Sequence, residues 1–317
     1  MLSRVADAMF WMARYMERSS CLLRVVRTHY IASQEEMLAL DWKAMVCAYA
    51  GVPDDGSPLP TAPQAVLHYL MLDRRNGSSI LNNITRAREN ARAVQDHITK
   101  EMWQSLNDFY HLIRDPAIAQ HLTGGDPVTA LDQLIRQAML YYGMADTTMA
   151  REEASHFLNA GKFLERAIQC AVLLEQKLAC AFEPGDHPGT TGWRSFLYSM
   201  SGYELYMKTF RGGIRPSLVL QLAILNTHFP HSLLYCLQQI QRHCESLKPE
   251  TESGGYQEIE FLIGNVLHLV RYSRIQHADR PQIEEFLRRI RDDLHAVAGG
   301  MDVHYFGLHH LEDYGTA

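Results

Sequence analysis

The chain has 317 residues, 47% of them hydrophobic, and a net charge of −6 at pH 7. This composition predicts a globular protein, built as two domains or as one helical body of two similar halves. The 30 basic residues are spread along the chain without a block, so we expect no nucleic-acid partner. The opening residues lack the apolar core of a signal peptide, and no apolar run reaches the ~20 residues that cross a bilayer. We therefore expect a cytoplasmic protein without a membrane partner.

Apolar residues recur at three- and four-residue steps, and strand-like alternation is scarce, so an all-α fold is predicted. A long helix is expected at 3–33, with Ser3 as its cap. Four prolines and two glycines at 51–63 predict a surface loop. In the Asp126-Pro127 pair the aspartate can cap a helix and the proline fits its first turn. The further helices expected in this part are one from Trp42 to before Gly51, a short one ending near 72, and those at 79–95, 100–120 and 127–142.

A similar order of elements is expected in the second part. It comprises a long helix from 146–147, a Gly/Pro loop at 184–192, a helix at Trp193, a break at 212–213, a short helix after Pro216, and helices at 231–247, 256–272 and 280–297. The six cysteines include no C-x-x-C pair and most lie among apolar residues, so we expect reduced, structural thiols.

The sequence of the first long helix is repeated in the second. Glu17-Arg18 corresponds to Glu165-Arg166 at an offset of 148, Trp42 to Trp193 at 151, and Ser79 to Ser232 at 153. Offsets that grow by small steps are typical of a duplicated unit with short insertions. We therefore predict a helical bundle of two duplicated multi-helix halves, 1–145 and 146–317, packed as one body.

Several short motifs occur together in this order: Met1-Leu-Ser-Arg at the start, Tyr15-Met-Glu-Arg18, Leu72-Asp73 followed by Ser78-Ser79, Ala87-Arg-Glu-Asn-Ala-Arg92, and Phe163-Leu-Glu-Arg-Ala167. With this order and spacing the chain resembles the bacterial alpha-E family, which is all-helical and named for a Glu-Arg motif. The resemblance spans nearly the whole chain. One departure is Ser19-Ser20, where many members have a sequence closer to Ala-Glu.

The resemblance implies no particular reaction. It does imply a genomic setting beside ATP-grasp-type ligase-like proteins and transglutaminase-like proteins, with some members fused to such ligases. Peptide or amide-bond chemistry is therefore the implied setting.

Two interpretations of the Glu-Arg pairs follow from their position on helices. Adjacent helical residues point about 100° apart, so Glu17 and Arg18 must contact different neighbours, and Glu17 can accept from Arg14 one turn earlier. The interpretation that we favour is a partly buried ion-pair network that holds the halves in register. In the alternative, Arg18 or Arg166 binds a carboxylate or phosphate in a cleft.

A second group of polar residues surrounds a predicted helix start. Ser78 or Ser79 caps this helix and leaves backbone N–H groups that can bind an anion. Arg88 and Arg92 lie two or more turns further, so one small phosphate cannot contact both the cap and Arg88, whereas a longer peptide or nucleotide can. The favoured interpretation is a cap followed by a charge cluster. The group consists of Asp73, Ser78, Ser79, Arg88, Glu89, Asn90 and Arg92.

The Glu153-x-x-His156 spacing is that of the ligands in di-iron carboxylate bundles, which need a second copy of the motif. The duplicated positions carry Val5 and Ala8 instead. We therefore expect no metal and no other cofactor.

Taken together, these features predict a helical binding or scaffolding subunit associated with an ATP-grasp-type amide or peptide ligase system, with ligase-like and transglutaminase-like proteins, or a peptide, as partners. The alternative is an enzyme that acts on a peptide-like substrate at a cleft between the halves, using Glu17, Arg18, Glu165 and Arg166.

Overall fold

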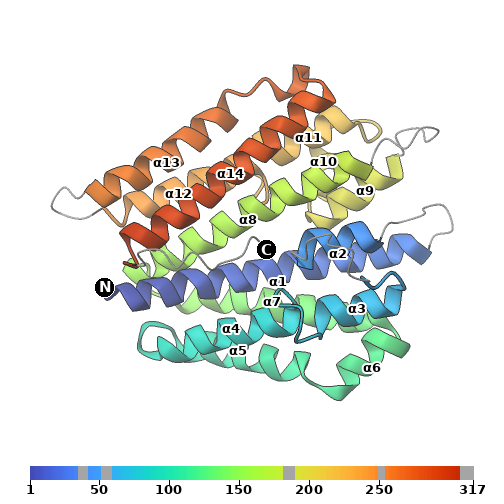
Figure 1. Ribbon diagram of the computed structural model, residues 1–317, viewed down its shortest axis with the longest axis horizontal. Coiled ribbons are helices and arrows are strands. Elements are labelled where there is room, and N and C mark those ends of the chain that lie inside the picture. The colour runs from blue at the N-terminus through green and yellow to red at the C-terminus, as the bar shows by residue number, and fades with distance from the viewer. Residues whose placement is uncertain (35–41, 51–58, 181–189, 249–253, 308–317) are drawn as a thin grey trace. The chain divides into compact units, whose positions relative to one another are not determined.

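The computed structural model describes residues 1–34, 42–50, 59–180, 190–248 and 254–307, and every regular element within them is a helix (Figure 1). The predicted all-α fold is therefore confirmed for this part of the chain. None of the helices described there is both long and apolar enough to span a membrane.

The chain divides into two compact units. The first, here called the N-terminal unit, is Trp11–Ser155. The second, the C-terminal unit, consists of Met1–Phe10 together with the described residues between 156 and 307. The long helix α1 (Ser3–Gln34) thus contributes its first two turns to one unit and the remainder to the other. The predicted boundary at 145 and the packing of the halves as one body stay predictions.

In the N-terminal unit α5 packs against α4 and α7, and α6 packs against α3 and α7. The apolar face of α5 supplies much of this core, because Met102, Leu106 and Phe109 are fully buried at three- and four-residue spacing. Besides α1, the elements are α2 (Trp42–Ala50), α3 (Pro63–Met71), α4 (Ile80–Ala93), η1 (Gln95–His97), α5 (Lys100–Ile113), α6 (Pro116–Gly124) and α7 (Pro127–Thr148).

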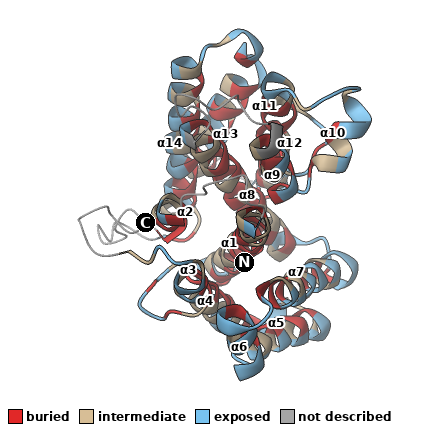
Figure 2. Ribbon diagram, turned by 90° about the vertical axis from the view of Figure 1, so that its right-hand side faces the viewer, coloured by how far each residue is buried: buried red, intermediate tan, exposed pale blue. Residues whose placement is uncertain are grey.

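In the C-terminal unit α13 packs against both α12 and α14, and α11 packs against α9 and α12. Arg291 of α14 donates to Glu175 of α8 at 2.5 Å. The buried residues, red in Figure 2, lie on the faces that helices turn toward their neighbours. The elements are α8 (Glu153–Cys180), α9 (Thr190–Ser199), α10 (Tyr203–Thr209), α11 (Pro216–Leu225), α12 (Leu233–Glu245), α13 (Gly254–Arg271), η2 (Ile275–His277) and α14 (Arg280–His304).

Two predicted helix starts are confirmed. The Ser79 side chain caps α4 by accepting from the backbone N–H of Asn82, and the Asp126 side chain caps α7 by accepting from Thr129. Pro127 occupies the first turn of α7, as expected. Among the described residues, no disulfide includes Cys21, Cys47, Cys170, Cys236 or Cys244.

Several predicted boundaries are wrong. The single helix expected at 100–120 is broken at Asp115-Pro116, because proline cannot continue the preceding helix and instead starts α6 with Asp115 as its cap. Helix α7 continues to Thr148, so the second long helix begins at Glu153 and not at 146–147. Helix α14 extends beyond 297 to His304.

The Trp193 helix ends at Ser199, where Ser201 adopts a left-handed φ of 56°, and the short α10 follows before the break at 212–213. The predicted loops at 51–63 and 184–192 lie largely outside the described residues.

Candidate functional site

Glu17 is a buried carboxylate in the middle of α1, with 1% of its surface exposed. The hydroxyl of Tyr142, on α7, donates to its Oε2 at 2.6 Å. A second contact between the same helices lies farther along, where Arg27 Nε donates to Asp132 Oδ1 at 2.5 Å. These two contacts join α1 to α7 within the N-terminal unit.

The residues beside Glu17 on α1 have cationic and aromatic partners. Buried Arg14 places its guanidinium 4.3 Å from the centre of the Trp11 ring, and Trp11 packs against Tyr15 at 5.6 Å. Arg86 of α4 lies 5.8 Å from the Tyr15 ring. Arg18 is half-buried on the same helix. The predicted hydrogen bond from Arg14 to Glu17 stays a prediction.

Glu165 and Arg166 occupy α8 in the C-terminal unit. Glu165 is fully buried, and its Oε1 accepts from Gln169 one turn later at 2.9 Å. Half-buried Arg166 donates to the backbone oxygen of Pro230 and lies 5.3 Å from the Phe163 ring. In both units the glutamate of the pair is thus buried and hydrogen-bonded, and the arginine is more exposed.

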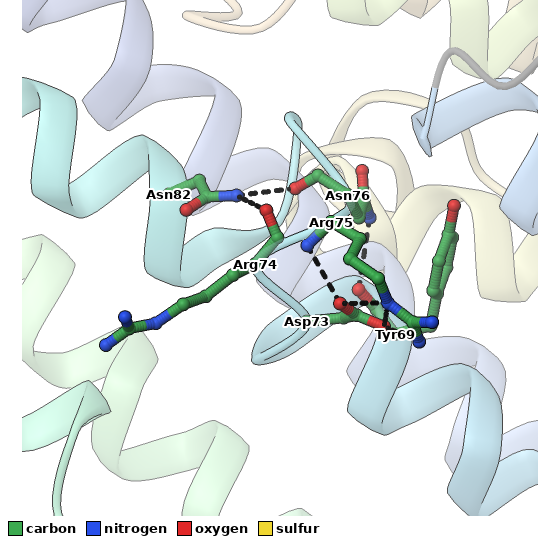
Figure 3. A network of polar contacts seen from close by, with 6 residues as sticks. All are labelled: Tyr69, Asp73, Arg74, Arg75, Asn76 and Asn82. Carbon is green, nitrogen blue, oxygen red and sulfur yellow. Dashed lines mark hydrogen bonds and ion pairs between the residues drawn. The ribbon is translucent and has the colours of Figure 1, made fainter.

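Asp73 lies in the turn between α3 and α4, where its carboxylate oxygens contact Arg75 of the same turn (Figure 3). Its carboxylate accepts from the backbone N–H of Arg75 at 2.8 Å and pairs with the Arg75 guanidinium at 2.7 Å. The hydrogen bond from Arg75 is the main reason that the pKa of Asp73 falls below its ordinary value. Asp73 therefore remains charged and closes the turn.

Asn76 organises the start of α4. Its side chain donates to the backbone oxygen of Tyr69, while Asn82 donates to the backbone oxygens of Arg74 and Asn76 (Figure 3). The Asn76 side chain also accepts from the N–H of Ser78. Asn76 is 2% exposed, so these bonds satisfy a buried amide. Ser78 belongs to this turn through its backbone.

Arg88 turns away from the cap and toward α5. Its Nε donates to Asn107 at 2.8 Å, and its guanidinium lies 4.5 Å from the Tyr110 ring and 5.5 Å from the Trp103 ring. Arg88 therefore contacts side chains of α5, whereas Ser79 caps α4.

The remaining members of the predicted cluster are more loosely held. Glu89 pairs with Arg88 at 3.2 Å and lies 4.0 Å from Arg92. Glu89 and Arg92 are exposed, and Asn90 is half-buried. Exposed pairs of this kind add little stability.

Sequence reasoning missed several partners. Tyr142 lies 125 positions from Glu17, and no local pattern indicates that contact. The spacing of Trp103, Asn107 and Tyr110 does put all three on one helical face, and it is a signal that points to the Arg88 site.

Two further acids were also missed. Asp7 and Asp302 lie close enough to interact, and burial first and the charge of Asp302 second raise the pKa of Asp7 to about 6. Within the described residues no group of three or more histidine, cysteine, aspartate or glutamate side chains forms a metal site.

Comparison with known proteins gives a family but no activity. Residues 1–306 match the model of the Alpha-E family, described as a predicted alpha-helical domain with a conserved ER motif. The uncharacterized proteins Mb2597 of Mycobacterium bovis, and MT2643 and Rv2567 of Mycobacterium tuberculosis, are each 23% identical over 327 residues. The aligned region covers 93% of this chain and 36% of each relative, so the chain spans about a third of their length. No solved structure matches the chain.

Proposed function

Because this chain belongs to the Alpha-E family, we propose that it is a helical binding or scaffolding subunit of an ATP-grasp-type amide or peptide ligase system. The observation that carries the proposal is that the matching relatives are much longer than the aligned region. In those proteins the helical domain is joined covalently to other protein segments, which keeps it at high effective concentration beside them. That arrangement favours a domain that acts through contact with a neighbouring protein.

The state of the two family glutamates also supports a structural role. Glu17 and Glu165 are at most 1% exposed, and each accepts a hydrogen bond from a side chain of its own unit. A general base must come within hydrogen-bond reach of the substrate proton that it removes. The enzyme alternative uses these two glutamates on its substrate. Because both are buried and already hydrogen-bonded, they favour the binding subunit over the enzyme.

The partners in this proposal are an ATP-grasp-type ligase-like protein, a transglutaminase-like protein or a peptide. We place the protein in the cytoplasm. The net charge of −6 and the spread of basic residues disfavour nucleic acid.

We also propose that the chain is a duplication of one multi-helix unit. Pro63 and Pro216 each occupy the first turn of a short helix, α3 and α11. Ser79 and Ser232 then cap α4 and α12 through the same side-chain contact, to the N–H three residues later. Each capped helix packs against the following α5 or α13. Superposing the two sets of helices tests this proposal, which fails if Glu17 does not fall on Glu165.

The functional test is affinity capture from the native host with the full chain, followed by identification of bound proteins and small molecules. Enrichment of an ATP-grasp-type or transglutaminase-like protein supports the binding subunit. A small molecule that co-purifies with the chain, without either protein, overturns it in favour of the enzyme. Glu17→Ala should melt below the parent, since it leaves the Tyr142 hydroxyl without this acceptor, and an unsatisfied buried polar group costs about 1–3 kcal/mol. Glu101→Ala, at an exposed acid of the same unit, is the control.

A further inference from the structure

His156 of α8 and His243 of α12 bring two ring nitrogens together in the C-terminal unit. Their Nδ1 atoms are 3.0 Å apart, and the ring centres are 5.3 Å apart with the planes at 48°. We propose that this pair binds one divalent transition-metal ion, with Cu²⁺ bound in preference to Zn²⁺. This proposal does not rest on the proposed function.

The distance between the two nitrogens fits a shared ion. Metal–imidazole bonds are about 2.0–2.1 Å long, so two nitrogens on one ion are about 2.9 Å apart at a right angle and about 3.4 Å apart at the tetrahedral angle. The observed 3.0 Å is the hydrogen-bonded distance of the metal-free pair and lies within this range, so both rings can reach one ion with little movement. Nitrogen ligands bind Cu²⁺ more tightly than Zn²⁺ in the general order of divalent-metal affinities, which is why Cu²⁺ is the preferred ion.

The hydrogen positions of the rings allow such binding without loss of a proton. In the metal-free pair one Nδ1 carries a hydrogen and the other accepts it. When the hydrogen of the donor ring moves from Nδ1 to Nε2, both Nδ1 atoms present lone pairs. The ion is then bound by two neutral imidazoles, and neither ring nor metal is oxidised or reduced.

The surroundings hold the ring of His243 in place. Phe163 stacks on this ring at 6.0 Å and 13°, and Tyr235 packs edge-on against Phe163 at 5.9 Å. Phe163 lies two turns after His156 on α8, so one helix supplies both the first histidine and the support for the second. Rings fixed in this way are organised for binding before the ion arrives. Both histidines are half-buried, which leaves access for the ion and its waters.

Nearby positive charges oppose the ion. Arg242 is close enough to act on His156, but it is exposed, so water and salt screen its charge. Lys162 and Arg166 lie against the Phe163 ring, at 4.5 Å and 5.3 Å from its centre, with that ring next to His243. Because no third histidine, cysteine or carboxylate joins the pair among the described residues, water must fill the other coordination positions. The site therefore takes up an exchangeable ion.

Calorimetric titration with Cu²⁺, using glycine as competing ligand, tests the proposal on the full chain. His309 and His310 are adjacent in the sequence and can bind Cu²⁺ themselves, so both are changed to alanine in every sample. We expect one Cu²⁺ per chain and paramagnetic resonance showing two bound imidazoles. His156→Ala and His243→Ala should each weaken binding by at least about tenfold, the scale seen even for second-shell changes. Zn²⁺ should bind at least about tenfold more weakly than Cu²⁺.

His268→Ala, at an exposed histidine on α13, is the matched control and should bind Cu²⁺ as the parent does. Should circular dichroism show that an alanine variant does not fold, His156→Asn or His243→Phe replaces it. Unchanged Cu²⁺ affinity in both folded histidine variants, or a resonance signal without two imidazole nitrogens, would overturn the site. Equal affinity for Zn²⁺ and Cu²⁺ would overturn its selectivity.

Discussion

Gly161 of α8 lies directly against the backbone of Phe10, so that a Cβ at position 161 would come within 2.3 Å of the Phe10 carbonyl oxygen. Phe10 itself is fully buried, and its ring contacts Phe306 at 5.3 Å. The first turns of α1 can therefore pack on α8 only because residue 161 has no side chain.

We predict that Gly161→Ala destabilises the protein. Alanine improves helix propensity by about 1 kcal/mol, but the clash is with backbone, and overpacking of a core costs about 1–3 kcal/mol or more. Thermal unfolding measures the net effect, which should be a lower midpoint. Gly264→Ala in α13 is the control, since a Cβ added there would have no atom within 4 Å, and it should raise the midpoint. A Gly161→Ala midpoint at or above the parent value contradicts the close contact.

Tyr142→Phe should destabilise the protein by roughly 0.5–3 kcal/mol, the range that covers hydrogen bonds to neutral and to charged groups. In a double-mutant cycle with Glu17→Gln, the two changes should couple by more than about 0.5 kcal/mol, because the side chains are in contact. Denaturant unfolding provides the four free energies. The neighbouring Tyr141→Phe is the control: the Tyr141 hydroxyl is buried without a hydrogen-bond partner among the described residues, so its loss should be neutral or stabilising. Additive effects of Tyr142 and Glu17 would show that the bond contributes nothing.

Asp7 should make the protein less stable as pH rises from about 4 to about 6. Its pKa is 3.8 in the unfolded reference and about 6 in the folded protein, so in this window the folded state binds the additional proton. Stability from this group is complete below pH 4 and is lost by the time pH passes 6. Asp7→Asn should remove this dependence of the unfolding free energy on pH, and it should raise the unfolding midpoint at pH 7. Asp292→Asn, an exposed position on α14, should leave this dependence unchanged. If the stability of Asp7→Asn falls between pH 4 and pH 6 as steeply as that of the parent, other titratable groups cause the pH dependence.

Removing either serine cap should lower the free energy of unfolding, by similar but unequal amounts. Ser79→Ala and Ser232→Ala should each cost about 1 kcal/mol, the typical value for a lost N-cap. Ser232→Ala should cost more, because the Ser232 hydroxyl also donates to the backbone oxygen of Asn226. Ser78→Ala is the control, since Ser78 contributes to the turn through its backbone. Equal midpoints for Ser79→Ala and the parent would contradict the capping role.

The parts of the fold that depend on local chemistry could be predicted from the sequence. A serine or aspartate before an apolar repeat indicates a helix start through contacts within four residues, as at Ser79 and Asp126. The break at Pro116 has the same kind of signal, because Asp115 precedes the start of α6. A single helix at 100–120 is nevertheless predicted, because apolar periodicity continues across this position. Helix ends such as Thr148 and His304 carry no comparable signal.

The candidate sites divide in the same way. The turn around Asp73 closes on residues next to it in sequence, so its composition indicated its position. The partners of Glu17 and of Arg88 come from other helices, 125 and 19 residues away, and packing alone selects them. The His156–His243 contact spans 87 residues and has no sequence pattern of its own.

The division of α1 between the two units has a consequence for synthesis of the chain. Phe10 must wait about 150 residues for Gly161 and about 296 residues for Phe306, which at about 5–20 residues per second takes roughly 8–30 s and roughly 15–60 s of synthesis. During that interval the apolar first turns of α1, including Met9 and Phe10, lack their final cover. A nascent chain released before position 156 therefore presents this segment to chaperones and proteases, and completion of the C-terminal unit is what removes it from them.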